Sequence, residues 1–468
     1  MKPVLNMDCV SFTYPGSSVP ALSDLSLSMD TCECVCISGS TGCGKTTLLM
    51  AVQGLLKDGD RHGSISIHPV LPGLNSGMVF QNAETQILCS TVEDEAAFWP
   101  ENCGMSADDI RLAVGDALDA VGLAGLRNRN VEALSAGQKH RLTIASVLSM
   151  KPGLIFMDEP CGQLDAPGKR QLIEILNHLK QRGHSLLIAD HELEPYRSIA
   201  DRFVLMEKGR IQRISRKLPS EYEMSRVFEG ISSDPSSRSF GPPAVEIRNL
   251  QVAGPEGDLL IDQLDLTVRR GEFVHIYGIN GSGKSTFLRC VCGFVPPESG
   301  MIRIAGINRP RPWQLAGKAA LLMQNPQRQL FEDTVFDEVS FALKIKGMRA
   351  DQIRERVMET LEGCALSHLA DRSPLTLSFG EQHRVALASV VVSEPEVLLL
   401  DEPFAGLDVN RRRQTIRQIE TICRDRKTAV IMASHNPLYA GHGADQSLAL
   451  EHGRFSPAVF NNQDMSLS

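Results

Sequence analysis

One ordered set of short motifs occurs twice along this 468-residue chain, and this repetition limits the possible folds more than any other feature. The glycine-rich stretch GSTGCGKT at 39–46 recurs as GINGSGKS at 278–285. Four later motifs recur 243 or 244 residues downstream: VFQN at 79–82 as LMQN at 322–325, LSAGQ at 134–138 as LSFGE at 377–381, FMDEP at 156–160 as LLDEP at 399–403, and His191 as His435. Five motifs in one order, at nearly constant spacing, indicate the tandem duplication of one domain.

The boundary between the two copies is expected where the repeat ends. Residues 231–243 are rich in Ser, Pro and Gly, a composition that favours neither a packed core nor a helix. We therefore predict a first domain at 1–230, a linker at 231–243 and a second domain at 244–468.

Each half has the pattern of an α/β fold. The segments 33–38 and 273–277 are typical of strands, and they lead through the glycine-rich stretches into the helical patterns at 45–53 and 284–292. Later apolar runs, such as 153–157 and 397–400, are continuous, as in strands buried on both faces of a parallel sheet. The sequence thus predicts two homologous domains, each with a mainly parallel sheet and an N-terminal β-rich part. In each, a helical insertion of about fifty residues, which includes 108–121 or 350–362, is expected beside the sheet.

The twelve cysteines do not form the pattern of a disulfide framework or of paired zinc knuckles. Cys32, Cys34 and Cys36 alternate, which predicts one face of a strand, and Cys290 and Cys292 fall within a predicted helix. We expect reduced thiols packed in a core.

Charge and hydropathy restrict the partners. The net charge is −8, which disfavours nucleic acid as a partner, and 42% of the residues are hydrophobic, as in an ordinary globular protein. The N-terminus has no apolar run of signal-peptide length, and the later apolar stretches are interrupted before a spanning length. We therefore expect a protein without a membrane span, located in the cytoplasm.

The glycine-rich stretches have the pattern of a phosphate-binding loop between a strand and a helix. Glycines let backbone N–H groups turn toward phosphates, and the helix N-terminus adds partial positive charge. Lys45 and Lys284 are then expected to reach the β- and γ-phosphates, and the hydroxyl groups of Thr46 and Ser285 to bind Mg²⁺.

The Asp-Glu pairs that end two apolar runs place carboxylates at the same site. Asp158 and Asp401 are the predicted magnesium-side acids, and Glu159 and Glu402 are placed to polarise an attacking water. An isolated Asp-Glu-Pro after a strand is often only a solvated loop, and a histidine after a strand is often structural. The repetition of both at matching distances favours function, with His191 and His435 completing the two sets.

The LSAGQ and LSFGE motifs predict helix starts. Ser135 and Ser378 fit N-caps, and Gly137 and Gly380 keep the first turn open to an anion. Because the glycine-rich loop of the same domain already surrounds one nucleotide, this second anion-binding helix end suggests a partner domain that supplies it in trans.

Together these motifs resemble the nucleotide-binding domains of ABC-type ATPases, which belong to the P-loop NTPases. Both halves carry the Walker A, Q-loop, signature, Walker B, D-loop and switch-histidine motifs, the D-loops being 162–165 and 405–408. The patterns QNAETQ…TVEDE at 81–95 and QNPQRQ…TVFDE at 324–338 further resemble the energy-coupling-factor importer ATPases of cobalt and vitamin transport, here fused as a pair.

The resemblance implies two ATP molecules, each held between the Walker A loop of one half and the signature of the other, in a head-to-tail pairing. Site one would join the Walker A, Walker B and histidine residues of the first half with Ser378 and Gly380, and site two those of the second half with Ser135 and Gly137. The implied catalytic residues are Glu159, His191, Glu402 and His435, and the implied magnesium-side residues are Thr46, Gln81, Asp158, Ser285, Gln324 and Asp401. The implied nucleotide-binding residues are Tyr14, Gly39, Ser40, Thr41, Gly42, Cys43, Gly44, Lys45, Thr46, Thr47, Gln81, Ser135, Gly137, Gln138, Gly278, Ile279, Asn280, Gly281, Ser282, Gly283, Lys284, Ser285, Thr286, Gln324, Ser378, Gly380 and Glu381.

Some positions differ between the halves. Tyr14 fits an aromatic ring that stacks on adenine, whereas the matching stretch 252–255 has none. Glu381 stands where the first signature has Gln138, which affects site one. Cys43 in the first phosphate loop is either a site sensitive to thiol reagents or a silent small residue. Both halves retain the glutamate and the histidine, so two hydrolytic sites are expected.

Three kinds of function fit such a chain. The resemblance implies a transport ATPase at the cytoplasmic face of the membrane, which contacts the membrane only through integral subunits, namely a coupling protein and a substrate-binding component. The alternative is a soluble tandem ATPase that acts on ribosomes or DNA, but the linker lacks the long basic helix typical of that class. A nucleotide-dependent regulator without turnover conflicts with the presence of Glu159 and Glu402. The transported substrate, a vitamin or a transition-metal ion, is not encoded in these motifs.

Overall fold

The computed structural model describes residues 3–68, 76–81, 83–162, 164–222, 238–254, 259–404, 407–435 and 444–458. The chain divides near residue 226 into two compact units. Of the predicted linker at 231–243, residues 231–237 lie outside the described residues, and strand β10 begins at its last residue, Pro243. None of the helices in the described part of the chain combines the length and hydrophobicity that a bilayer crossing requires.

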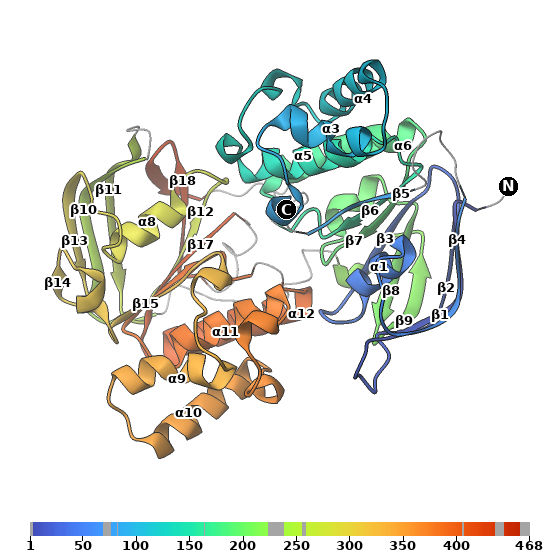
Figure 1. The fold of residues 1–468 in the computed structure, drawn as a ribbon. Helices are drawn as coiled ribbons and strands as arrows, with labels where there is room; N and C mark the ends of the chain where they lie inside the picture. Colours follow the sequence, from blue (N-terminus) through green and yellow to red (C-terminus); the bar gives the residue numbers. More distant parts are fainter. Residues whose placement is uncertain are drawn as a thin grey trace. The chain divides into compact units, whose positions relative to one another are not determined.

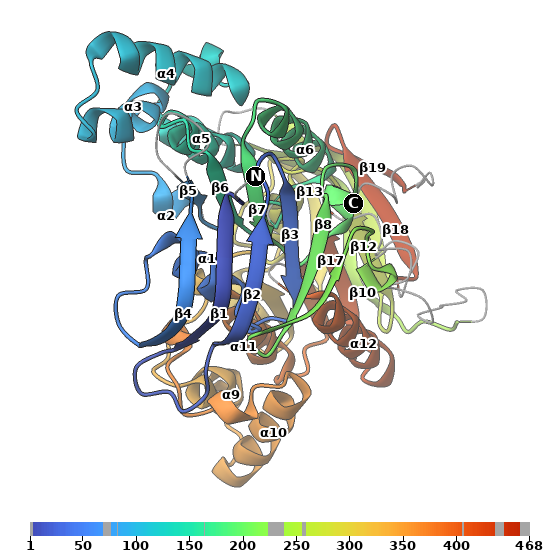
Figure 2. The same cartoon turned by 90° about the vertical axis from the view of Figure 1, so that its right-hand side faces the viewer.

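The first unit contains two sheets (Figures 1 and 2). Strands β2, β1 and β4 form a three-stranded antiparallel sheet, and the second sheet has the order β5-β6-β7-β3-β8-β9, parallel except for its edge strand β9. The strands are β1 Leu5–Thr13, β2 Leu22–Met29, β3 Cys34–Gly39, β4 Asp60–Ile67, β5 Ser76–Val79, β6 Leu154–Asp158, β7 Ser185–Ala189, β8 Arg202–Glu207 and β9 Arg210–Ser215. The helices are α1 Lys45–Gln53, α2 Ala83–Gln86, α3 Val92–Asn102, α4 Ala107–Ala120, α5 Ala136–Leu148 and α6 Ala166–Gln181.

The second unit repeats this topology. Its sheets have the orders β11-β10-β13-β14, which is antiparallel, and β15-β16-β17-β12-β18-β19, which is parallel except for β19. The strands are β10 Pro243–Ala253, β11 Leu259–Arg269, β12 Phe273–Tyr277, β13 Ser299–Ile304, β14 Ile307–Asn308, β15 Ala319–Leu322, β16 Val397–Asp401, β17 Ala429–Ser434, β18 Gln446–Glu451 and β19 Arg454–Pro457. The helices are α8 Lys284–Val291, α9 Val335–Ile345, α10 Ala350–Gly363, α11 Phe379–Val391 and α12 Val409–Asp425. The predicted fold class, an α/β sheet core with an N-terminal β-rich part and a helical insertion in each half, is confirmed.

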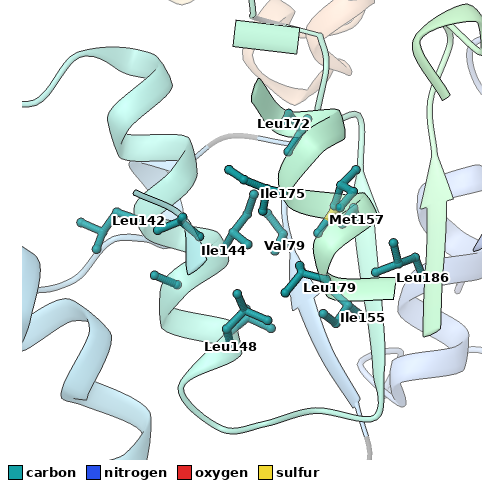
Figure 3. Packing of buried hydrophobic residues seen from close by; sticks show 14 of the residues in the cluster. Val79, Leu142, Ile144, Leu148, Ile155, Met157, Leu172, Ile175, Leu179 and Leu186 are labelled. Carbon is teal, nitrogen blue, oxygen red and sulfur yellow. The ribbon is translucent and has the colours of Figure 1, made fainter. Parts of the chain in front are cut away.

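The parallel sheets are buried on both faces, as their continuous apolar strands predict. Every residue of β3, β6, β7, β16 and β17 is buried. In the first unit, side chains of α5 and α6 pack on β5, β6 and β7 (Figure 3), with Leu142, Ile155, Leu179 and Leu186 buried. Because side chains lock the strands from both sides, the strand ends that carry polar residues are held in fixed positions.

The helical insertions lie beside the sheets. In the first unit α3, α4 and α5 pack together, and in the second unit α9, α10 and α11 do so (Figure 1). Thr91 and Thr334 cap α3 and α9 by accepting hydrogen bonds from the backbone N–H groups three residues later, which fixes where each insertion begins.

The prediction of thiols packed in a core is correct for most cysteines but wrong for Cys32, and Cys9 and Cys103 are exposed as well. Cys34 and Cys36 are buried on β3 and Cys290 and Cys292 are also buried, whereas Cys32 is exposed in the turn before β3 with a φ of 60°. A strand face therefore includes only two of the three alternating thiols, because the chain turns at Cys32 before the strand begins.

Candidate ATP site

Both glycine-rich loops join a buried strand to a helix, β3 to α1 and β12 to α8. Gly44 and Gly283 take φ values of 105° and 98°, which only glycine adopts without strain. A Cβ atom on Gly39 would lie 2.1 Å from the carbonyl oxygen of Met206, so this loop closes against β8 only with glycine there. The loops thus expose backbone N–H groups at a helix N-terminus, which is a binding site for phosphate.

The two predicted lysines lie over these loops. Nζ of Lys45 donates a 2.9 Å hydrogen bond to the carbonyl oxygen of Gly39, and Nζ of Lys284 donates one of 2.7 Å to that of Gly278. Both ammonium groups are buried. A buried cation beside a glycine-rich loop provides the positive charge that a triphosphate requires.

The strand-ending aspartates fit a magnesium ion. Asp158 ends β6, and its Oδ2 accepts a 2.8 Å hydrogen bond from Oγ1 of Thr46. Within the described part of the chain, no group donates a hydrogen bond to the buried Oδ1 of Asp158 or of Asp401. Burial raises the pKa of each carboxyl group to about 6, with a further increase from the glutamate that follows. An unpaired buried carboxylate oxygen next to a hydroxyl group is the oxygen ligand set that Mg²⁺ prefers, with ATP phosphates supplying the remaining ligands.

The glutamates that follow are held in a strained backbone. Glu159 and Glu402 have φ values of 49° and 50°, a left-handed conformation that costs a non-glycine residue about 1–2 kcal/mol. Such strain persists only where the surrounding structure determines it. Here the N–H groups of Glu159 and Glu402 donate to the carbonyl oxygens of Ala189 and Ala433 on the neighbouring strand.

In the first unit, Glu159 is the centre of a chain of polar contacts. Nε2 of Gln81 lies 2.6 Å from Oε2 of Glu159, and Nε2 of His191 lies 2.7 Å from Oε1. The other ring nitrogen of His191, Nδ1, lies 3.4 Å from Nζ of Lys45. The structure therefore brings four predicted residues, Lys45, Gln81, Glu159 and His191, into one connected group.

In the second unit, His435 contacts the matching glutamate. Nδ1 of His435 lies 2.9 Å from Oε1 of Glu402. Burial raises the pKa of Glu402, but His435 and Lys284 outweigh burial, so the pKa lies below its usual value and the carboxylate is ionised at neutral pH. Gln324, by contrast, is exposed and makes no hydrogen bond to any described residue.

The signature motifs begin helices α5 and α11, as predicted. In α5, the N–H group of Gln138 donates to Oγ of Ser135, and the N–H group of Ser135 donates to Oε1 of Gln138. In α11, both the N–H group and the hydroxyl group of Ser378 donate to Oε2 of Glu381. Glu381 therefore places a carboxylate at a helix end that is expected to bind an anion. It also occupies the hydroxyl group of Ser378 through a hydrogen bond.

The remaining predicted residues have these positions. The hydroxyl group of Tyr14 lies 3.1 Å from Oγ1 of Thr47, and its ring stays partly exposed. Cys43 is buried. Asp165 and Asp408 of the D-loops cap α6 and α12, while residues 163, 405 and 406 lie outside the described residues. Ser378 and Gly380 belong to the second unit, so their joining with the first-unit residues stays a prediction.

Sequence reasoning missed several residues that shape the site. Oε2 of buried Glu95 accepts hydrogen bonds from the N–H groups of Leu88 and Cys89, and Oε2 of Glu338 accepts them from Phe331 and Glu332. These glutamates are the last residues of the patterns at 81–95 and 324–338, so the repeat itself was the available signal. Asp190, the residue before His191, has no such signal, because the matching residue in the second half is Ser434.

Comparison with known proteins agrees with this geometry. The ABC transporter family matches residues 22–162 and 261–405. A protein of Bifidobacterium longum named as an ABC transporter ATP-binding protein is 32% identical over 93% of this chain, which spans 64% of that relative's length. A protein of Methanosarcina acetivorans with the same kind of name is 31% identical over 97% of this chain and 85% of its own. Among solved structures, the RNase-L Inhibitor has a similar fold, with a TM-score of 0.64 over 97% of this chain and 91% of its own at 19% identity.

Proposed function

The chain belongs to the ABC transporter family, as an ATPase with two ATP-binding domains, and we propose that it powers a membrane transporter of the energy-coupling-factor type that takes up a vitamin or a transition-metal ion. In this proposal it is bound at the cytoplasmic face of the membrane through a coupling protein and a substrate-binding component. One structural feature, present in both units, supports a docked partner.

This feature is a turn with an exposed apolar residue at its tip, residues 87–89 in the first unit and 330–332 in the second. Buried Glu95 and Glu338 fix these turns by accepting two backbone hydrogen bonds each, of 2.8 to 2.9 Å. The side chains at the tips, Leu88 and Phe331, are nevertheless 68% and 62% exposed. A rigid turn that presents a large apolar side chain to water is typical of a surface that binds another protein.

The helix that follows each turn carries further exposed apolar side chains. Phe331 packs edge-to-face on partly exposed Phe341 of α9, with ring centroids 4.8 Å apart, and Ile345 at the end of the same helix is exposed. In the first unit, half-exposed Trp99 lies on the matching helix α3 and packs on Phe98. Repetition of this surface in two domains is expected if each binds an equivalent segment of a membrane subunit.

The turns are also connected to the catalytic residues. Gln86 donates to the carbonyl oxygen of Met78 and accepts from the N–H group of Phe80, which fixes the chain just before Gln81. Gln329 likewise accepts from the N–H group of Met323, next to Gln324. A partner bound at the turn therefore acts on a segment that ends at the glutamine of the ATP site, and this link provides a route between nucleotide and transport.

Within one site, each residue has a distinct proposed role. Lys45 and the loop N–H groups bind the phosphates, Thr46 and Asp158 hold Mg²⁺, and Glu159 accepts a proton from the attacking water. His191 keeps Glu159 oriented. When bound, Mg²⁺ neutralises charge that develops on the phosphate oxygens. We propose that Ser378 and Gly380 of the second half complete this site, and that Ser135 and Gly137 complete the other.

Co-purification from detergent-solubilised membranes tests the transport function. The tagged wild-type chain is expected to recover integral membrane proteins, and Leu88→Asp together with Phe331→Asp is expected to lose them. The control is Leu112→Asp, which adds the same charge at an exposed leucine on α4, outside the turns. Recovery of ribosomes without any integral membrane protein would instead indicate the soluble tandem ATPase.

A further inference from the structure

Asp190, the residue directly before His191, is a buried carboxylate with three hydrogen-bond donors. Its Oδ2 accepts a 2.6 Å hydrogen bond from the hydroxyl group of Tyr196 and one of 3.3 Å from the N–H group of Cys161. Its Oδ1 accepts one of 3.1 Å from the N–H group of Glu192. Only 2% of Asp190 is exposed, so water hardly reaches its carboxylate. The three donors compensate for the free-energy cost of losing that hydration.

These donors come from the two segments that carry the catalytic pair. Cys161 lies two residues after Glu159, whereas Glu192 and Tyr196 lie just after His191. Asp190 therefore joins the turn that follows Glu159 to the loop that follows His191. The two catalytic side chains meet at the 2.7 Å contact between Nε2 of His191 and Oε1 of Glu159.

The loop after His191 is anchored at two further points. Tyr196 is fully buried and belongs to the hydrophobic core of the first unit, so the donor to Asp190 is itself held in place. Glu192, the residue after His191, forms a buried ion pair of 2.5 Å with Lys169 of α6. His191 thus lies between two buried carboxylates whose positions are fixed by α6 and by the core.

The second unit uses different side chains at the matching positions. The residue before His435 is Ser434, whose Oγ lies 2.8 Å from Nε2 of buried His275 on β12. His275 matches Cys36 of the first unit. Burial lowers the pKa of His275 to about 3, so this pair is neutral at physiological pH. The second unit therefore has no carboxylate at the position of Asp190.

We propose that Asp190 is a positioning residue for hydrolysis at the first ATP site, where it holds the imidazole of His191 against Glu159 by joining the loop and the turn that carry them. This inference rests on the proposed roles of Glu159 and His191. Loss of the anchor leaves Lys45 and the glycine-rich loop intact, so nucleotide binding persists. The orientation of His191 is lost, and misplaced catalytic groups reduce turnover steeply.

The test uses the full chain with Glu402→Gln, which restricts hydrolysis to the first site. Asp190→Ser introduces the residue of the second unit and is expected to lower kcat roughly tenfold, with KM for ATP changed less than about twofold. Tyr196→Phe removes one oxygen atom, and a roughly threefold lower kcat is expected. Because Tyr196→Phe keeps the core volume, it carries the test if Asp190→Ser fails to fold. The control, Ser149→Ala, also removes a buried hydroxyl hydrogen bond, at the end of α5.

A double-mutant cycle separates positioning from a general structural role. If Tyr196 and Asp190 act through His191, Tyr196→Phe has no further effect on kcat in a His191→Ala background. An equal loss in both backgrounds, an equal loss in Ser149→Ala, or unchanged kcat in folded Asp190→Ser and Tyr196→Phe would each overturn the proposal. Failure of the catalytic assignment gives a different result, since Glu159→Gln would then retain turnover in the same background.

Discussion

The side-chain amide of Gln81 donates a 2.6 Å hydrogen bond to Oε2 of Glu159, whereas Gln324, at the matching position of the second unit, is exposed. Identical residues at the two ATP sites thus have different environments. The first glutamate is held by both an amide and an imidazole, and the second, among the described residues, by His435. The two sites are equal in motif but not in local structure.

Gln81→Ala is expected to lower the free energy of unfolding of the first unit by about 1 kcal/mol, because a hydrogen bond to a charged group is lost at a partly buried position. Gln324→Ala is the matched control, and no measurable change is expected. Urea denaturation of both variants measures the effect. A loss for Gln324→Ala as large as that for Gln81→Ala would contradict the difference between the sites.

Glu159→Gln and Glu402→Gln are each expected to remove about half of the ATPase activity, since a general base contributes roughly a hundredfold or more at its own site. The double variant is expected to be inactive. Steady-state ATPase assays of the three variants check this. If either single substitution leaves turnover unchanged, the prediction of two hydrolytic sites is wrong.

Tyr14→Ala is expected to weaken ATP binding at the first site by about 1 kcal/mol, or about fivefold, because the ring is available for stacking on adenine. Tyr14→Phe keeps the ring and loses only the contact with Thr47, so it should bind ATP nearly as well as the wild type. In the wild type, calorimetric titration should resolve a weaker second site, since residues 252–255 include no aromatic ring. Equal affinities would argue against this role for Tyr14.

Glu381→Gln is expected to lower KM for ATP at site one about twofold, because a negative charge at a helix N-terminus competes with phosphate for the same N–H groups. The reciprocal Gln138→Glu should raise KM at site two. Each is measured in a chain whose other site carries the glutamate-to-glutamine substitution. Unchanged KM in both would indicate that these helix ends do not bind ATP.

His140→Leu is expected to make the first unit more resistant to acid. Burial lowers the pKa of His140 to about 4, and neither ring nitrogen has a hydrogen-bond partner among the described residues. Between pH 6.5 and 4 the unfolded chain binds a proton that the folded chain does not, so stability decreases as the pH falls, by up to about 3 kcal/mol. His140→Leu should remove this loss.

Thermal unfolding at pH 7 and pH 5 measures the change for His140→Leu. The control is His62→Leu, at an exposed position of β4, for which the pH dependence should stay that of the wild type. An unchanged difference between the two pH values in His140→Leu would show that His140 does not carry the acid sensitivity.

The sequence predicted the sheet core closely because its signals are strong and local. Helix α1 begins at Lys45 and ends at Gln53 as expected, since Gly44 and Gly54 both adopt left-handed conformations that end regular structure. The contacts of Lys45, Asp158, Glu159 and His191 followed from strand ends that meet at one edge of a parallel sheet.

Other features depend on tertiary contacts that no local pattern specifies. The different environments of Gln81 and Gln324 follow from chain conformation and not from residue type. Asp190 accepts a hydrogen bond from Tyr196, which lies beyond the repeated motifs. The matching residue in the second half, Ser434, does not indicate this contact. Glu95 illustrates an intermediate case, in which the repeat indicated importance but only the structure shows that the carboxylate binds two backbone N–H groups.

The left-handed backbone at Glu159 and Glu402 makes the glutamate at this position costly to keep in either copy of the domain. Glycine would relax the chain at either position, so a copy released from the need for a carboxylate would gain stability by losing its glutamate. A strained glutamate is therefore present in both copies at a cost in stability, as expected if each copy uses its own carboxylate.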